Sequence, residues 1–376
     1  MEKALNYYKN NIKAVNEKLK KLEKVLIYFS ILRFIIVILC IGIMYYFYKQ
    51  SSIEAMGASF LVFLLIFIIV AFFHNEKINK KKKLLIILEY NEKGIKRLDN
   101  TWREFKDIGE EFINKKHKFS NDLDIFGKSS LFQWINLTKT SFGRKNLANK
   151  MMMNSLPTRY DIQEEQEAIK ELSNKREFCE KIYFEASIEN KKKENIEELL
   201  KWLDKDEKSN FTIKYISYLF ITITFIMIFL TITRKVSISN LILDLIINYL
   251  VIKLLTKRLS DVISIFINNK KEIYKYSNML SIIQDENFKS KKLLSIQKGL
   301  VSSNINCKNE MKKLKNIISC LGDSTSNAYY LIVNVLFMSD IFILSNLEEW
   351  KVKNGYKVRK WLNDMGEIEA LISLST

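Results

Sequence analysis

The chain has 376 residues, of which one is proline and ten are glycine, and its formal net charge is +18. Proline and glycine interrupt helices and shape the turns between strands, so their scarcity excludes a fold rich in strands and tight turns and predicts an all-α protein. Hydrophobic residues make up 48% and charged residues 27%, a mixture that indicates amphipathic helices joined to a few very apolar segments.

The positive charge admits two interpretations. Clustered lysines bind the phosphates of duplex DNA, which makes DNA a candidate partner. Lysine is also abundant along the whole chain, and lysines beside apolar segments mark the cytoplasmic side of a membrane.

Cysteine and histidine usage argues against disulfides and metal sites. The four cysteines share no C-x-x-C spacing, which is typical of a reducing compartment. The two histidines, His74 and His117, lie far apart and outside any zinc-binding motif, so we expect no metal.

An N-terminal region, residues 1–75, predicts a cytoplasmic helix followed by a transmembrane hairpin. Its apolar segments are residues 26–48 and 55–73, each close to the ~20 residues needed to cross the hydrocarbon layer. Arg33 lies near the cytoplasmic end of the first segment, where its side chain can reach the interface.

A second hairpin is predicted in residues 211–253. Residues 215–233 are uncharged, whereas residues 236–252 carry Asp244 near their middle, so the second arm inserts marginally alone and more readily as the return of a hairpin. An intramembrane carboxylate faces either a bundle interior or an aqueous path. For Asp244 we keep three interpretations: a hydrogen bond between helices, a shallow hairpin, or a transport path.

The lysine distribution predicts the orientation. Lysines crowd residues 3–24, 77–83, 208–214 and 253–258, whereas the short turns hold few. The positive-inside rule then gives a multi-pass protein of the cell membrane with both termini cytoplasmic and the lipid bilayer as a partner. A further apolar stretch, residues 329–344, has only 16 residues and includes Asn334 and Asp340, so we expect a buried core helix there.

Residues 76–119 predict one long, charged, lever-like helix, and residues 120–210 predict several short ones. Ser141 and Thr158 suit helix N-caps, and Pro157 forbids continuation of the preceding helix. A charged helix is expected from Asn190.

The tripeptide Gly127-Lys128-Ser129 matches the end of a P-loop, G-x-x-x-x-G-K-[ST]. Asp122 stands where the first glycine should be, and Asp124 adds a second carboxylate where phosphate oxygens would sit. The sequence therefore argues against a nucleotide site here, and we expect neither a catalytic residue nor a bound cofactor.

The stretch "DIFGKSSLFQWINLTKTSFGRKNLANKMMMNSLPTRYDIQEEQEAIKEL" resembles the start of the core domain of the MutS DNA mismatch repair ATPase family. The family pattern is Gly-x-x-Ser-Leu, Thr-x-Thr-x-x-Gly-Arg, a Leu-Pro step and an Ile-x-x-x-Gln helix. Where the family usually has Arg before that Gln, this chain has Glu165. The matching residues are Gly127, Ser130, Leu131, Thr138, Thr140, Gly143, Arg144, Leu147, Leu156, Pro157, Ile162, Gln166, Ala168 and Ile169. Their expected roles are structural: Gly143 allows close helix approach or a cap, and Thr138 and Thr140 supply local caps.

The segments "NVLFMSDIFILSNLEEWK" and "WLNDMGEIEALISLST" resemble the family's closing core helices. The resemblance implies a lever and second core half over residues 254–376, whose last helix buries Ile368, Leu371, Ile372 and Leu374. In the family an ATPase domain that uses ATP and Mg²⁺ follows. We expect it as a domain or subunit encoded downstream, and we expect no ATP hydrolysis by residues 1–376.

These observations lead to two main hypotheses and a minor one. The first is a membrane-anchored MutS-like core and lever module, which couples ATP binding by a separate ATPase domain to the binding of DNA or of a protein partner. The family resemblance also implies that the module is a homodimer. The second is a helical membrane scaffold that binds a cytoplasmic protein and no DNA. The third is a transporter that uses Asp244, for which four short-turned spans leave little room.

Overall fold

The computed structural model describes residues 2–154, 156–188, 196–205, 212–256, 260–302, 305–321 and 328–376. In these ranges the regular structure is helical, apart from one two-residue antiparallel ladder between β1 (Val301–Ser302) and β2 (Ile305–Asn306). The predicted all-α class is confirmed. The chain divides into a first unit, residues 1–135 with Thr376, and a second unit, residues 136–375.

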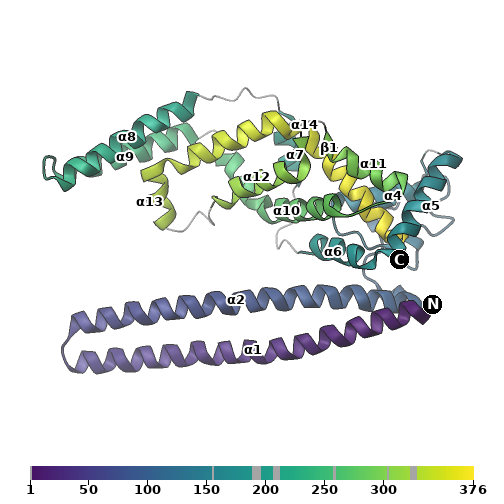
Figure 1. Ribbon diagram of the computed structural model, residues 1–376, viewed down its shortest axis with the longest axis horizontal. Helices are drawn as coiled ribbons and strands as arrows, with labels where there is room; N and C mark the ends of the chain where they lie inside the picture. The colour runs from purple at the N-terminus through teal and green to yellow at the C-terminus, as the bar shows by residue number, and fades with distance from the viewer. Residues whose placement is uncertain are drawn as a thin grey trace. The chain divides into compact units, whose positions relative to one another are not determined.

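The first unit is built on a long antiparallel hairpin of α1 (Glu2–Lys49) and α2 (Ile53–Leu98) (Figure 1). Both helices are long and apolar enough to span a membrane, and their apolar parts contain the predicted segments 26–48 and 55–73. At 1.5 Å per residue, helices of 48 and 46 residues are roughly 70 Å long, more than twice a ~30 Å hydrocarbon layer. The hairpin is therefore much longer than the part of it that a membrane could enclose.

The polar end of the hairpin is held by close helix packing. Val15, Leu19 and Leu22 are buried along one face of α1. Asn11 donates to Asn91 of α2 at 3.2 Å. A Cβ at Gly94 would lie 2.5 Å from the ring of Tyr8, so only glycine lets the helices approach this closely here.

Arg33 faces the second helix of the hairpin. Its guanidinium lies 3.3 Å from the Nδ1 atom of His74 and 4.9 Å from the ring centroid of Phe67. These contacts lie at the end of the apolar stretch of α2, and the expected reach of Arg33 to the membrane interface stays a prediction.

The prediction of one helix over residues 76–119 is wrong in its second half, because α2 ends at Leu98. Asp99 accepts hydrogen bonds from the amide and hydroxyl of Thr101, and Asn100 has left-handed backbone (φ 67°) and accepts from Trp102 Nε1 at 2.8 Å. These local bonds compete with the helix ladder and end it. The elements that follow are short: η1 (Trp102–Glu104), η2 (Glu110–Phe112) and α3 (Leu131–Ile135).

The second unit is a helical core around α14 (Ser339–Leu374), shown in yellow in Figure 1. This helix contacts many of the others, and its buried residues include Ile368, Leu371 and Ile372 as predicted, whereas Leu374 is half-buried. The other helices are α4 (Ser141–Met152), α5 (Arg159–Asn174), α6 (Arg176–Ala186), α7 (Ile196–Asp204), α8 (Thr212–Ile232), α9 (Ile238–Thr256), α10 (Ser260–Asp285), α11 (Lys291–Gly299), α12 (Cys307–Ser319) and α13 (Ala328–Phe337).

Two boundaries in this unit differ from the predictions. Thr140, and not Ser141, caps α4, because its hydroxyl accepts from the Gly143 amide at 2.9 Å. The stretch 329–344 is not one helix: it breaks at Met338, which has left-handed backbone (φ 47°), into α13 and the start of α14. Thr158 caps α5 as predicted, in a capping box with Asp161. The predicted helix start at Asn190 lies outside the described residues.

The predicted second hairpin is present as α8 and α9, joined by a turn at Arg234 (φ 56°). Among the described residues its apolar stretch Ser217–Ile232 is shorter than the two long helices of the first unit. The length and composition that would identify a span are therefore shown for α1 and α2, and insertion of α8 and α9 is a proposal.

Candidate functional site

The residues that carry the family resemblance fall in both units. Gly127, Ser130 and Leu131 belong to the first unit, and the rest, from Thr138 onward, belong to the second. Within the second unit, Thr140 and Gly143 lie against the C-terminal turns of α14.

The loop at Gly127-Lys128-Ser129 has no phosphate cradle. Its backbone amides are used internally: Gly127, with φ 104°, donates to the carbonyl of Ile108 at 2.8 Å, and Ser129 donates to Gln133 Oε1 at 2.6 Å. No strand precedes the loop in residues 2–135, and α3 has only five residues. Ser130 caps α3 by accepting from the Gln133 amide at 3.2 Å.

The centre of the candidate site is Glu369 on α14. Its carboxylate accepts hydrogen bonds from the amides of Lys139 and Thr140, the latter at 3.1 Å, and from the hydroxyl of Thr140. Glu369 is 2% exposed, so burial raises the pKa of this carboxyl while the three donors oppose the shift. We call this arrangement the α4–α14 joint.

Further hydrogen bonds at Ser373 and Thr138 extend the joint. Ser373 Oγ accepts from the Leu137 amide at 3.0 Å and donates to the Glu369 carbonyl at 3.2 Å. Thr138 donates to Asn136 Oδ1 through both its amide and its hydroxyl. Thr140 thus has the capping role that we expected, whereas at Thr138 the acceptor is the side chain of Asn136.

Two glycines allow the helices of the joint to touch. A Cβ on Gly143 would collide with the carboxylate of Glu369, and a Cβ on Gly366 would lie 2.7 Å from the backbone carbonyl carbon of Phe142. Leu147, one turn further along α4, is fully buried. Gly143 and Leu147 therefore serve packing, as expected.

Several other motif residues lie toward the surface, whereas Ala168 of α5 is fully buried. Arg144 is half-buried, Gln166 is exposed on α5, and Pro157 is exposed directly before the Thr158 cap. Nothing in their surroundings indicates a ligand.

Glu165, the departure from the family pattern, has a partner of its own. Lys150 of α4 pairs with Glu165 and lies 3.5 Å from Glu367 of α14, which also pairs with Lys292 of α11 at 2.7 Å. Although burial opposes ionisation of Glu367, Lys292 and Lys150 hold the pKa of this carboxyl below its ordinary value. The ion pairs connect four helices at the C-terminal end of the core.

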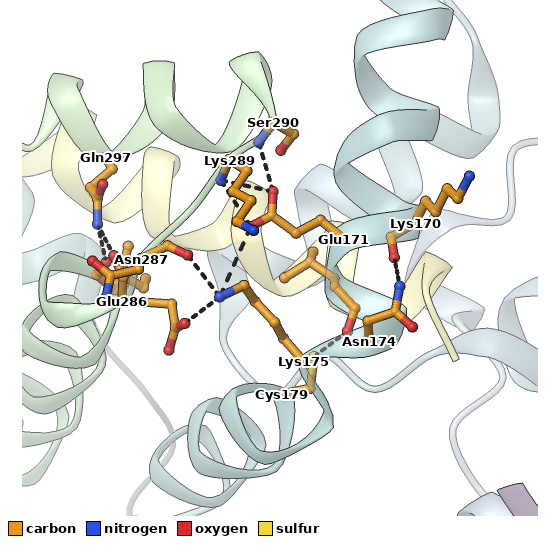
Figure 2. Close-up of polar contacts among 12 residues, drawn as sticks. Lys170, Glu171, Asn174, Lys175, Cys179, Glu286, Asn287, Lys289, Ser290 and Gln297 are labelled. Carbon is orange, nitrogen blue, oxygen red and sulfur yellow. Dashed lines mark hydrogen bonds and ion pairs between the residues drawn. The ribbon is translucent and has the colours of Figure 1, made fainter. Parts of the chain in front are cut away.

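A second set of polar contacts joins α5 to the turn before α11 (Figure 2). Glu171 accepts from the backbone amides of Lys289 at 2.9 Å and Ser290 at 2.7 Å, directly before α11. Lys175 donates to the carboxylate of Glu286 and to the Asn287 carbonyl at 2.7 Å. Because the partners are more than 110 positions apart, no local sequence pattern could have identified these contacts.

Burial also shifts the pKa of a thiol on α6. Burial raises the pKa of the Cys179 thiol to about 12, so this cysteine is not a nucleophile near neutral pH. Among the described residues, no group of three or more His, Cys, Asp and Glu side chains could hold a metal ion. The α4–α14 joint can hold α4 and α14 in fixed positions relative to each other. A displacement of α4 would therefore also displace α14.

Asp244 lies in the second hairpin, away from the joint. It is 9% exposed and accepts from Thr224 of α8 at 2.9 Å, while Asn248 donates to the same threonine oxygen at 2.7 Å. Of the three interpretations, the hydrogen bond between helices is therefore present.

We expect Glu369→Ala to destabilise the second unit by roughly 3–5 kcal/mol, because two buried amides and a hydroxyl lose their acceptor. Glu369→Gln keeps one carbonyl oxygen and should lose clearly less. Thermal unfolding of the detergent-solubilised protein measures both changes. Equal melting temperatures for the wild type and the alanine variant would contradict the role of the joint.

We expect Gly143→Ala to lower stability by about 1–3 kcal/mol, although alanine is the better helix former, because the new methyl group collides with Glu369. Ser141→Ala is the matched control in the same helical turn, since Ser141 is exposed and is not the cap. The control should be neutral or slightly stabilising. The same melting experiment compares the two, and a stabilised Gly143→Ala protein would refute the close contact.

Asp364 on α14 predicts a pH dependence. Burial raises the pKa of its carboxyl from 3.8 to about 6, so the folded state binds a proton that the unfolded state releases, and stability falls as pH rises from about 4 to 6. Asp364→Asn should therefore raise the melting temperature above pH 6 and leave it nearly unchanged below pH 4. A difference that is independent of pH would contradict this assignment.

Comparison with known proteins gives no relative for this chain: no family model, no curated protein and no solved structure matches it. The fold and the geometry of the joint are therefore the basis for the function proposed below.

Proposed function

We propose that the chain is a membrane-anchored helical module of the MutS core-and-lever type, which couples an ATP-driven partner to the engagement of DNA or of another protein. The observation that supports it is the α4–α14 joint. Two segments that carry the resemblance, residues 124–172 and 361–376, are far apart in sequence, yet Glu369 binds the turn at Thr140 directly.

The lever in this proposal is α14. It has 36 residues and is therefore about 54 Å long at 1.5 Å per residue. Glu369 holds one end at the joint, and the other end contacts the second hairpin, where the rings of Tyr218 and Phe342 lie 5.0 Å apart and Lys214 donates to Asn346 at 3.4 Å. A rod held at both ends transmits displacement when each ligand state favours a different position of the rod.

The anchor consists of α1 and α2, with α8 and α9 as a second pair of spans. Lysines flank the apolar stretches at residues 77–83 and at Lys214 and Lys253, and by the positive-inside rule they favour a cytoplasmic position for the soluble helices and both termini. The bilayer is then a permanent partner of the chain.

The motor in this proposal is a separate domain or subunit with its own P-loop, ATP and Mg²⁺, because the loop at Gly127-Lys128-Ser129 uses its amides internally. Duplex DNA and a second copy of the chain are the further partners that the resemblance implies. The net charge of +18 favours DNA through its phosphates.

A second candidate function, a membrane scaffold for a cytoplasmic protein, is favoured by the outer face of α14. Val352 is 62% exposed and Tyr356 is 73% exposed, one turn apart on this helix. An exposed aromatic residue beside an aliphatic one is typical of a protein-binding surface.

Binding to DNA separates the two functions. For the core-and-lever function we expect detergent-purified protein to bind duplex DNA, with an affinity that falls steeply between 50 and 200 mM salt and a preference for mismatched over matched duplex. Fluorescence anisotropy with labelled duplexes measures both. The same preparation should hydrolyse no ATP, and Lys128→Ala serves as the control for any hydrolysis that appears.

The other outcomes are equally informative. A steep salt dependence without mismatch preference indicates backbone electrostatics alone. Absence of DNA binding at low salt favours the scaffold, and hydrolysis that Lys128→Ala abolishes would overturn the assignment of the motor to another polypeptide.

A further inference from the structure

Side chains of α13 and α14 form hydrogen bonds across the corner between these two helices. Only Met338 separates the two helices, and Asn334 accepts from the Asp340 amide at 2.9 Å and from the Ser339 hydroxyl at 3.1 Å, while donating to the Asp340 carboxylate at 2.6 Å. The Met338 carbonyl accepts from Ile341 at 3.0 Å. The amides of Asp340 and Ile341 at the helix break are thus bonded within the protein.

This corner lies against the second hairpin partway along its length (Figure 1). The rings of Phe337 and Phe225 are 6.0 Å apart, and Asn248 donates to the Val335 carbonyl at 3.4 Å. An apolar cluster joins the three elements further, comprising Phe220, Ile221, Val251, Ile252, Met338, Ile341 and Phe342. Phe225 and Asn248 are interior positions of the two predicted spans, so the corner is at the depth of the spans and not at their ends.

The hairpin at this depth is polar inside and apolar outside. Thr224, Asp244 and Asn248 are buried between the helices and bonded to one another. The outward side chains are apolar and more than half exposed: Leu219, Phe225, Ile226, Phe229, Ile242, Leu243, Ile246 and Leu250. In hydrocarbon, polar side chains face the interior of a bundle and apolar ones face the lipid, so this arrangement fits lipid, with the Oδ1 atom of Asn248 as one buried acceptor that has no partner among the described residues.

We propose that the α13–α14 corner is a re-entrant element, which enters the hydrocarbon layer beside α8 and α9 and leaves on the same side. The proposal rests on the proposed insertion of this hairpin. Irregular backbone is tolerated at membrane depth only where protein satisfies it, and Asn334 does so here. The return path agrees, because α14 is apolar at Ile341–Leu344 and becomes charged from Glu348 onward.

Site-directed spin labelling tests the depth of the corner. Cys40 and Cys320 are replaced by serine, and the buried Cys179 and Cys307 are kept. Single nitroxides at Phe337→Cys, Phe225→Cys and Tyr356→Cys are then compared in phosphatidylcholine and phosphatidylglycerol vesicles by their collision rates with oxygen and with a soluble nickel chelate. Leu336→Cys is a second corner position if Phe337→Cys folds poorly.

The re-entrant corner predicts that the labels at positions 337 and 225 are several-fold more accessible to oxygen than to nickel and lie at the same depth, with the label at position 356 in water. Nickel access at 337 with lipid contact at 225 would overturn the corner and leave the inserted hairpin intact. Nickel access at both would overturn the insertion of the hairpin as well. Protection of both labels from oxygen and nickel alike would indicate a protein partner and would also overturn the proposal.

Discussion

The second unit depends on one buried carboxylate. Removing Glu369 from water costs several kcal/mol, and this cost is offset only because two amides and a hydroxyl converge on it. They can converge because Gly143 and Gly366 leave no side chain between α4 and α14. The carboxylate of Glu369 and the two glycines therefore depend on one another. A larger residue at either glycine would separate α4 from α14 and leave the carboxylate without its donors.

The ion pairs around the joint act in support of it. A partly exposed pair such as Lys175 with Glu286 contributes little by itself. Glu171 differs, because its carboxylate accepts hydrogen bonds from two backbone amides directly before α11. Amides at the start of a helix have no partner within the helix itself. Carboxylates that accept from backbone amides therefore contribute more to the stability of this core than ion pairs between side chains do. Both kinds join segments that the second hairpin separates in the sequence.

The sequence was sufficient wherever the deciding interaction is local. The scarcity of proline and glycine gave the helical class, the Thr158 capping box lies within four residues, and the apolar stretches of α1 and α2 are continuous. It failed where a nearby side chain accepts from the backbone, as Asp99 does from the Thr101 amide and Asn334 does from the Asp340 amide. It had no signal for Glu369, whose partner is 229 positions away. Glu165 shows the same limit, since its pairing with Lys150 depends on how α4 and α5 pack.

The two ends of α14 are packed in different environments. Near Met338 its neighbours are mainly apolar, and polar side chains such as Thr224, Asp244 and Asn334 form hydrogen bonds within the protein. Near Glu369 its neighbours supply backbone donors and lysines. A hinge between the two regions would uncouple them, and the glycines of α14 are the obvious places for one. Both are closely packed, however: a Cβ on Gly355 would lie 3.2 Å from the Leu203 carbonyl oxygen, and Gly366 lies against Phe142. These glycines therefore serve close packing, and α14 connects its two ends as a continuous rod.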